Sequence, residues 1–478
     1  STSATSRDYD SDIRFGTGAV LVVDSTTDQT LSGEISGAGE LRKYNTGTLT
    51  VTGANTYTGR TIVGAGVLSV SSLADGGTAS NIGQSSAAAG NLEFSGGIFR
   101  YTGSSVITDR SILLTDGGNA TIDVTQSGTR LTFGGTMGAA TSSTMVSSSF
   151  AKAGDGSLEI VGNARYSGNT TVNDGRLIYQ GTLTGGNTDD SYGSSISLAN
   201  DTGIVFSPSA GVEQTITGLI SGAGALFKID AGLLELTQQN TYTGGTTVGG
   251  LDNLGTTSGT KITGGTLFLN GGTPSASGIG TIRGTLTVNA EGDLPSTDAS
   301  YVRTTVQLGT AYDAVLGWRP GQNVTTLNIK NGALVEKLTG GNSGREHLWN
   351  MSGGVNFDGG GELSINGGVS DPATGNWFEW GGTSVTVTNP TAQAVISGRI
   401  RLRVDNTQPS FNIPAKAAGT TDYGSELLIS AALTQSGNGG AVTKSGAGTL
   451  ELSGDNRYTG NTTVSAGSRP RTSNIPAG

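Results

Sequence analysis

The sequence predicts an all-β protein built as a β-solenoid, and three observations support this fold class. A short unit with fixed internal spacing occurs four times in the 478 residues, which is typical of stacked repeats. Apolar residues alternate with polar ones in many short segments, as in strands with one buried face. No stretch sustains apolar residues at helical spacing over three turns. We therefore expect a parallel β-helix, whose core grows by adding coils.

The repeat is defined by residues at constant distances from a tyrosine. A lysine lies fourteen residues before it and a leucine eight residues before it, and a glycine, a threonine and a valine follow at two, four and six residues. We expect these positions to be structural. The four copies contain Lys43, Leu49 and Tyr57; Lys152, Leu158 and Tyr166; Lys228, Leu234 and Tyr242; and Lys444, Leu450 and Tyr458.

Each copy predicts a strand, a turn and a further strand. In the first copy, Leu49 and Val51 alternate with threonines and form the expected strand. The segment Gly-x-Asn-x-Tyr-Thr-Gly predicts a turn, because glycine and asparagine accept positive φ angles. Another strand follows, and coils of roughly 20–25 residues are expected. The residue between the two apolar positions is expected to face water, and it is Thr50, Glu159, Glu235 or Glu451.

The repeats and the composition divide the chain into three expected parts. Strand-like segments continue between the complete copies, but all four tryptophans and the one histidine gather between the third and fourth copies. Pro470 stands where the last repeat needs a strand, so we expect that repeat to be truncated. The expected parts are a β-helix over residues 1–305 with repeats near 33–70, 148–179 and 217–270; a less regular, tryptophan-rich part of the rod over 306–395; and a resumed β-helix over 396–478.

Composition and charge exclude several classes of function. The formal net charge is −10, whereas nucleic-acid binders need a basic surface, so we expect no nucleic-acid partner. No apolar run approaches the 18 or so residues of a membrane helix, so we expect no membrane span within the chain. Glycine and proline, 81 and 10 residues, make up about a fifth of the sequence, which is below the level of low-complexity chains.

The complete repeat resembles a known family. It reads Gly-Ala-Gly-x-Leu-x-Lys-x-x-x-Gly-Thr-Leu-x-Leu-x-Gly-x-Asn-x-Tyr-Thr-Gly-x-Thr-x-Val and is similar to the autotransporter-associated β-strand repeat, also called the passenger-associated transport repeat. The resemblance implies the right-handed parallel β-helix of an autotransporter passenger domain, exported across the outer membrane of a Gram-negative bacterium and displayed on or released from the cell surface. The chain lacks the membrane strands that end an autotransporter, so we expect a processed or truncated piece, or a repeat borrowed by another surface protein.

Chemistry-bearing residues are few. Asp189 and Asp190 are similar to acidic motifs of polygalacturonase-type enzymes, but their companions are missing and the segment equally fits a solvated turn. A Ser-His-Asp triad has only His347 available, and a chain with one histidine and no cysteine excludes a conventional zinc site. We therefore expect no catalytic residue, no cofactor and no metal, with calcium at the oxygen-rich segment 356–362 as an alternative.

The tryptophans are one candidate binding surface. Flat aromatic faces can bind sugar rings or a partner protein. The alternative is that these side chains seal an irregular junction in the solenoid. The candidates are Trp318, Trp349, Trp377 and Trp380.

A stripe of arginines is the second candidate. Arg399, Arg401 and Arg403 alternate with apolar residues, so strand geometry places the three guanidinium groups on one face. Such a stripe can bind an anionic polysaccharide or the carboxylates of a partner. The alternative is that the arginines pair with acidic residues of neighbouring coils.

These observations predict a secreted bacterial surface rod that acts as a non-catalytic adhesin or passenger. Its expected partner is a glycan or a surface protein of the host or of neighbouring cells. One alternative is a structural building block of an extracellular filament, coat or matrix, which requires self-association. The second alternative is a glycan-active β-helix enzyme, because the scaffold permits one.

Overall fold

The computed structural model is built mainly of short parallel β-strands joined by turns. The described residues fall into two compact units, one within residues 7–224 and the other within residues 225–472. The described ranges are 7–139, 145–185, 191–251, 261–272, 277–310, 315–317, 319–338, 345–365, 377–403, 408–419, 424–437 and 439–472.

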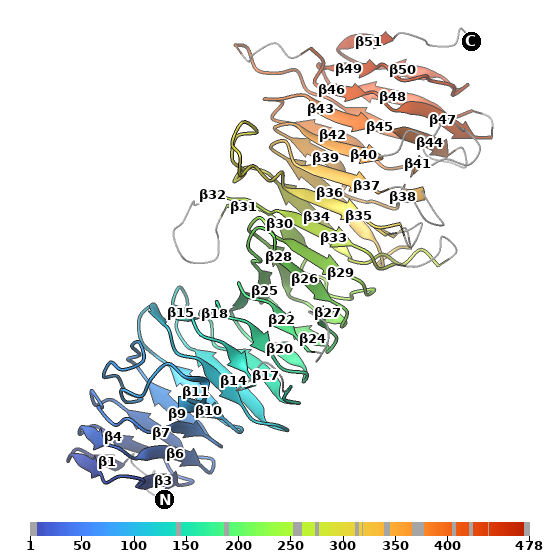
Figure 1. Ribbon diagram of the computed structural model, residues 1–478. Helices are drawn as coiled ribbons and strands as arrows, with labels where there is room; N and C mark the ends of the chain where they lie inside the picture. The colour runs from blue at the N-terminus through green and yellow to red at the C-terminus, as the bar shows by residue number, and fades with distance from the viewer. Residues whose placement is uncertain are drawn as a thin grey trace, which may run out of the picture. The chain divides into compact units, whose positions relative to one another are not determined.

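The first unit is a three-sided parallel β-helix (Figure 1). One sheet contains, in spatial order, β1 (Arg7–Tyr9), β4 (Gln29–Leu31), β7 (Thr48–Val51), β9 (Val67–Val70), β11 (Ile98–Tyr101), β14 (Asn119–Val124), β17 (Ser149–Ala153), β20 (Thr170–Val172), β24 (Ile196–Leu198) and β27 (Ile220–Gly222). The second contains β22 (Leu183–Thr184), β19 (Ala164–Arg165), β16 (Met137–Gly138), β13 (Ile112–Leu114), β10 (Leu92–Phe94), β8 (Thr61–Val63), β6 (Glu40–Tyr44) and β3 (Val20–Asp24).

The third face of this unit is shorter. It contains β12 (Val106–Thr108), β15 (Arg130–Phe133), β18 (Ser157–Ile160), β21 (Arg176–Tyr179) and β25 (Gly203–Phe206), and β2 (Ile13–Phe15) beside β5 (Ile35–Gly37) forms a separate pair. Strands β23 (Ser191–Tyr192) and β26 (Glu213–Ile216) pair with each other in a different sheet. Successive coils visit the three sheets in the same order, β10, β11, β12 and then β13, β14, β15. Within the described ranges the helical structure is one 3₁₀ turn, η1 (Ala89–Asn91).

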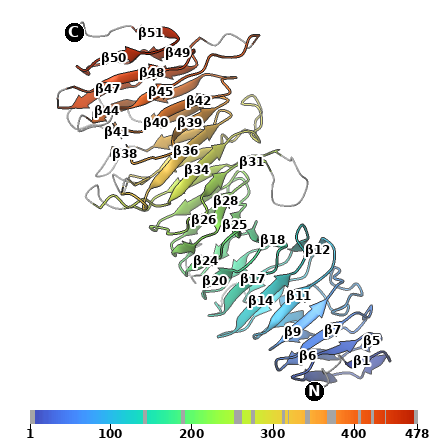
Figure 2. The same cartoon turned by 180° about the vertical axis from the view of Figure 1, so that it is seen from behind.

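The second unit has two long parallel sheets and a short third face, seen from behind in Figure 2. One long sheet contains β28 (Ala225–Lys228), β30 (Thr246–Val248), β34 (Gly284–Asn289), β36 (Val324–Lys330), β39 (Gly354–Asp358), β42 (Val385–Thr388), β45 (Ser410–Asn412), β48 (Val442–Ser445) and β50 (Thr462–Val464). The other contains β29 (Leu233–Leu236), β33 (Thr266–Leu269), β35 (Thr305–Leu308), β37 (Leu334–Lys337), β40 (Gly361–Ile365), β43 (Ala394–Ser397), β46 (Leu427–Ile429), β49 (Thr449–Leu452) and β51 (Ser468–Thr472).

The short third face consists of β38 (Arg345–Trp349), β41 (Trp377–Gly381), β44 (Arg399–Arg403) and β47 (Ala432–Ser436). An antiparallel pair, β31 (Gly250–Leu251) with β32 (Lys261–Ile262), also belongs to this unit. The tryptophan-rich part of the chain therefore supplies coils that contain a third strand. The expectation of a parallel β-helix is confirmed for both units.

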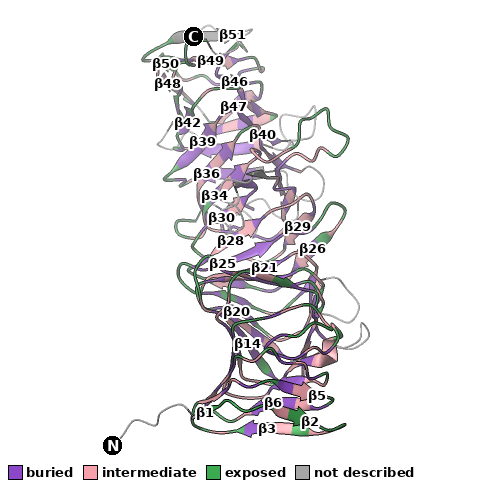
Figure 3. Cartoon of the chain, turned by 90° about the vertical axis from the view of Figure 1, so that its left-hand side faces the viewer, coloured by how far each residue is buried: buried purple, intermediate pink, exposed green. Residues whose placement is uncertain are grey.

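The core of each unit is a set of in-register columns of aliphatic side chains. Figure 3 colours the buried residues along the strands purple. In the first unit Leu131, Leu158 and Leu177 occupy equivalent positions on β15, β18 and β21, and all three are fully buried. In the second unit Leu234 and Leu267 begin an equivalent column on β29 and β33. Stacking like residues in this way removes their apolar surface from water without enlarging the cross-section.

Each repeat copy is one coil of twenty residues. The lysine of every copy pairs with the valine that lies twenty residues later, on the neighbouring strand of the same sheet. In the first unit the two copies place their lysines in different sheets, on β6 and β17, whereas both lysines of the second unit lie in one sheet, on β28 and β48. The constant spacing thus encodes a coil length. The pairs are Lys43 with Val63, Lys152 with Val172, Lys228 with Val248, and Lys444 with Val464.

The lysine of each repeat is buried and bound by backbone carbonyls. The ammonium of Lys43 donates to the carbonyl oxygens of Tyr44 and Asn45 at 2.7 and 2.8 Å, and to that of Ala65 at 3.2 Å. The other three lysines make the corresponding contacts, two to the residues that follow them and one to a residue 22 or 36 positions later. An ammonium has three donors and no acceptor, so three carbonyls satisfy it.

The tyrosine of each repeat is also buried. Its hydroxyl lies 2.5 to 2.7 Å from the hydroxyl of the threonine four residues later, in all four copies. Tyr242, for example, has no exposed surface and contacts Thr246 in this way. The repeat therefore retains threonine for a hydrogen bond inside the coil, where an unpaired tyrosine hydroxyl would be costly.

Two local details differ from what the repeat pattern predicts. Glu159, expected to face water, is only 5% exposed. A strand, β51, does follow Gly467, and Pro470 lies where its register with β49 shifts by one residue. A register irregularity tolerates proline because one backbone N–H is left out of the ladder there.

Candidate binding surface

The third face of the second unit brings Trp349 and Trp377 together with the arginine stripe. Strands β38, β41, β44 and β47 follow one another along this unit in Figure 1 and pair in parallel register. Phe378, Ile400 and Leu402 point to the core and are at most 1% exposed. Because side chains alternate along a strand, the residues between them lie on the outer face. We call Trp349, Trp377, Arg399, Arg401 and Arg403 the Trp–Arg surface.

Arg403 stacks on Trp349 across an intervening strand. The guanidinium carbon lies 3.5 Å from the centre of the indole ring. Gly381 is paired with Trp349 and lies between the two side chains; a Cβ atom there would lie 3.3 Å from Trp349 Cδ1 and 3.4 Å from Arg403 Cδ. The glycine therefore leaves the space in which the two side chains meet. A cation over an indole face is attracted by the ring quadrupole.

Arg401 makes a second contact of this kind. Its guanidinium carbon lies 5.2 Å from the centre of the Trp377 ring. The guanidinium forms no hydrogen bond or ion pair with any residue that the structure describes, and the side chain is partly exposed. The stack therefore holds the group while its N–H donors remain available.

His347 and Glu379 form the inner part of the same face. They are paired on β38 and β41, and His347 Nδ1 lies 3.6 Å from Glu379 Oε2. The imidazole also meets the Trp349 ring edge to face, with ring centres 4.7 Å apart. Both side chains are nearly buried. Glu379 thus lies between His347 on one side and Arg401, its register partner on β44, on the other.

The other residues singled out by the sequence have different environments. Trp380 is fully buried, and its indole nitrogen donates to the carbonyl of Thr383 at 3.1 Å, so it belongs to the core rather than to the surface. Trp318, Asp189 and Asp190 lie outside the described residues. In the segment 356–362, Asp358 and Glu362 form ion pairs with Lys330 and Arg303. Among the described residues, no group of three or more acidic or histidine side chains is arranged to hold a metal ion.

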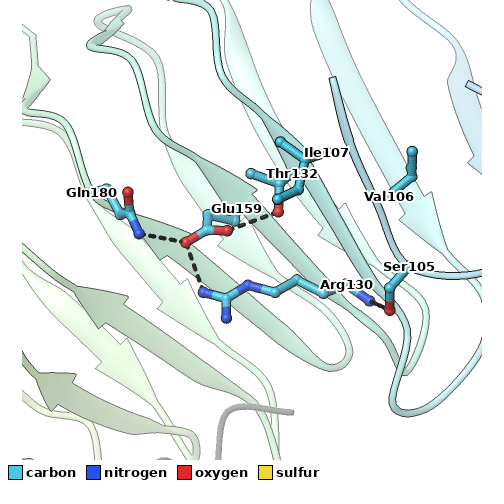
Figure 4. A pocket seen from close by; sticks show the side chains of 7 residues that line it. All are labelled: Ser105, Val106, Ile107, Arg130, Thr132, Glu159 and Gln180. Carbon is cyan, nitrogen blue, oxygen red and sulfur yellow. Dashed lines mark hydrogen bonds and ion pairs between the residues drawn. The ribbon is translucent and has the colours of Figure 1, made fainter. Parts of the chain in front are cut away.

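The first unit has a recess of about 460 Å³ that was not predicted from the sequence (Figure 4). At its base the carboxylate of Glu159 accepts hydrogen bonds from Arg130 at 2.7 Å, Thr132 at 2.8 Å and Gln180 at 2.8 Å. Ile107, which is 74% exposed, stands at the rim. Arg130 and Gln180 lie 29 and 21 residues from Glu159 in the sequence. They meet because each lies about one coil away from Glu159, and the sequence alone does not give these coil lengths.

Several titratable groups are buried inside the two units, and burial shifts their pKa values. Burial lowers the pKa of Lys228 to about 7 and that of Lys152 to about 8. Burial also raises the pKa of Glu346, although Lys337 and three backbone N–H groups act in the opposite direction. These groups lie inside the units and do not contribute to the Trp–Arg surface.

The parallel sheets and the repeated coils define the class of this protein as a parallel β-helix. The family model of the passenger-associated-transport-repeat matches residues 41–70, 150–178, 226–250 and 442–468. These repeats, together with the similarity to an autotransporter, support a passenger-type protein that is exported across the outer membrane to the cell surface or beyond. Within the described parts of the chain, no helix has the length and apolarity needed to cross a membrane.

One curated relative is an adhesin. The chain is 35% identical to the Adhesin BmaC autotransporter of Brucella suis biovar 1 (strain 1330) over 264 residues, which is 49% of this chain and 7% of that protein. The chain thus corresponds to a small fraction of the length of that relative. No solved structure matches the chain.

Proposed function

We propose that the chain is the non-catalytic, adhesin-type part of a surface passenger and that it attaches through the Trp–Arg surface. The carrying observation is Arg401, whose guanidinium is stacked on Trp377 with its donors not bound by any described residue. The name of the curated relative supports the adhesive role. The partner is a glycan or a surface protein of a host or neighbouring cell.

Strand pairing holds the residues of the Trp–Arg surface in place before a ligand binds. Arg401 and its neighbours project from β44, which pairs with β41 on one side and with β47 on the other. Side chains on a paired strand lose less freedom on binding than side chains on a loop, which favours affinity. A parallel β-helix thus supplies a pre-organised face without a cavity.

The way in which acidic side chains are used supports a non-catalytic role. Glu159 accepts three side-chain hydrogen bonds, and Glu346 accepts from the backbone of Val315, Leu316 and His347. A general acid or base must exchange its proton with a substrate. Carboxylates bound in this way hold coils together instead.

An attachment assay tests the proposal. The chain is applied to immobilised host-cell matrix, and the bound fraction of the wild type is compared with that of Arg399→Gln/Arg401→Gln/Arg403→Gln. The matched control removes three charges elsewhere, at Arg42, Arg60 and Arg457, whose side chains are 31%, 38% and 65% exposed. We expect roughly tenfold weaker attachment, the loss of about 1.4 kcal/mol, only in the first variant. Equal attachment of the two variants would contradict the proposal.

A further inference from the structure

We propose that the Trp–Arg surface binds an acidic polysaccharide and not a neutral one. This inference rests on the proposed attachment function and names its ligand class. Three observations support it: arginines contact the tryptophan rings, the guanidinium of Arg401 has donors that no described residue accepts, and β44 is paired on both sides.

The indole rings on this face carry arginines. Arg403 lies over Trp349 at 3.5 Å from the ring centre, and Arg401 lies over Trp377 at 5.2 Å. A neutral sugar is bound by stacking its ring on an open aromatic face. Here the described stacking partner of each ring is a guanidinium group, so the rings orient cations instead of presenting platforms.

Arg401 provides the anion-binding group. A guanidinium has five N–H donors in a planar fork, which matches a carboxylate or sulfate through two parallel hydrogen bonds. The guanidinium of Arg401 donates to no residue in the described part of the chain. The contact with the Trp377 ring uses none of these N–H donors, so they can bond to a ligand.

The arrangement of charge fits a linear polyanion. Arg399, Arg401 and Arg403 occupy alternate positions of one strand, so their Cα atoms are spaced by about 6.6 Å. The chain carries a net charge of −10, so this row of cations is a local exception. Thr434 and Ser436 pair with Arg401 and Arg403 on β47 and add hydroxyl groups that can bond to a polyhydroxylated ligand.

The pairing of β44 disfavours a peptide. Extended peptides commonly gain affinity by adding a strand to an open sheet edge. Strand β44 is paired on both sides, with β41 through Phe378, Glu379 and Trp380, and with β47 along its whole length. A protein ligand on this face would have to bind through side chains alone, whereas an acidic polysaccharide needs no main-chain pairing.

Binding measurements on the full chain test the inference. The probes are polygalacturonate, dextran sulfate, neutral dextran and poly-L-glutamate, titrated at low and at physiological salt. We expect polygalacturonate or dextran sulfate to bind, with affinity that falls as salt rises; the tighter of the two identifies a carboxylate or a sulfate as the anionic group. We expect dextran not to bind and poly-L-glutamate to bind at least about tenfold more weakly, since every 1.4 kcal/mol is tenfold.

Variants assign the binding to Arg401. Arg401→Gln should weaken polyanion binding about tenfold, whereas Arg457→Gln, which removes a charge from an exposed pair with Asp455 in the same unit, should leave it unchanged. Arg401→Lys should lie between them, because lysine keeps the charge without the fork. Circular dichroism and thermal unfolding verify that each variant is folded.

Three outcomes would overturn the inference. They are dextran binding as tight as that of the polyanions, a preference for poly-L-glutamate, and equal losses in Arg401→Gln and Arg457→Gln. If the wild type binds no polyanion but attachment to matrix still depends on the three arginines, the ligand class is wrong and the attachment function stands. If attachment does not depend on them, the proposed function itself fails.

Discussion

The ammonium nitrogen of Lys228 lies 2.8 Å from the carbonyl oxygen of Gly264, which is 36 residues further along the chain. The same nitrogen donates to the carbonyls of Ile229 and Asp230, immediately after the lysine. One side chain thus closes its own turn and joins it to a later segment. Every copy of the repeat contains this arrangement, which explains why a charged residue is retained inside a β-helix.

Removing the lysine should destabilise the second unit. In Lys228→Met the three carbonyls lose their donor, and an unsatisfied buried acceptor costs about 1–3 kcal/mol. The control is Lys330→Met, because Lys330 is 35% exposed and pairs with Asp358 at 3.3 Å; such surface pairs contribute less than about 1 kcal/mol. Chemical unfolding monitored by circular dichroism measures the difference. Equal stability of the two variants would show that the carbonyls do not need the ammonium.

The buried lysines also predict a dependence of stability on pH. Burial lowers the pKa of Lys228 to about 7, whereas lysine in an unfolded chain titrates near about 10.4. Between these values the unfolded state binds more protons, so the free energy of unfolding should rise with pH. We expect the rise between pH 7 and 9, and a smaller rise in Lys228→Met. A flat profile in the wild type would mean that the three carbonyls keep the lysine charged.

The column of core residues predicts how the coils respond to substitution. Leu234 is fully buried and in register with Leu267, so Leu234→Asp places an unpaired carboxylate in the core and should prevent cooperative folding of the unit. Tyr242→Ala should cost about 3–5 kcal/mol because the ring is buried, and Tyr242→Phe about 1 kcal/mol through the lost contact with Thr246. A Tyr242→Ala cost below that of Tyr242→Phe would contradict the burial of the ring.

The spacing of the repeat allowed much of the fold to be predicted. The offset of twenty residues between Lys43 and Val63 is a coil length, and alternation at Leu49 and Val51 gives the buried face. The role of Lys43 itself could not be predicted, because its acceptors are backbone carbonyls, which leave no trace in the sequence.

In the sequence, the Trp–Arg surface can be recognised only as two separate features, the tryptophans and the arginine stripe. Trp349 and Arg403 are 54 residues apart in the sequence, and they meet because the intervening coils place β38, β41 and β44 side by side. Coil lengths in this region are irregular, so the register could not be read from the sequence. The sequence predicted Trp380 as a surface residue together with Trp377, because it does not show which face of the strand points to the core. The structure buries Trp380.

Gly381→Ala tests whether stacking matters apart from charge. The added Cβ would lie 3.3 Å from Trp349 and 3.4 Å from Arg403, so these two side chains must move apart while every charge remains. We expect polyanion affinity to fall a few-fold, by less than about 1.4 kcal/mol. Isothermal titration calorimetry measures the change, and thermal unfolding reports any loss of structure. Unchanged affinity would show that the Trp349–Arg403 contact does not organise the surface.

Oxidative footprinting of the attached protein tests the central claim most directly. The chain is oxidised in solution and when bound to immobilised host-cell matrix, and mass spectrometry measures oxidation at each aromatic residue. We predict that Trp349 and Trp377 are protected on attachment while Tyr9, which is 51% exposed on the first unit, is oxidised equally in both states. Unchanged oxidation of both tryptophans, or protection of Tyr9 alone, would contradict attachment through the Trp–Arg surface.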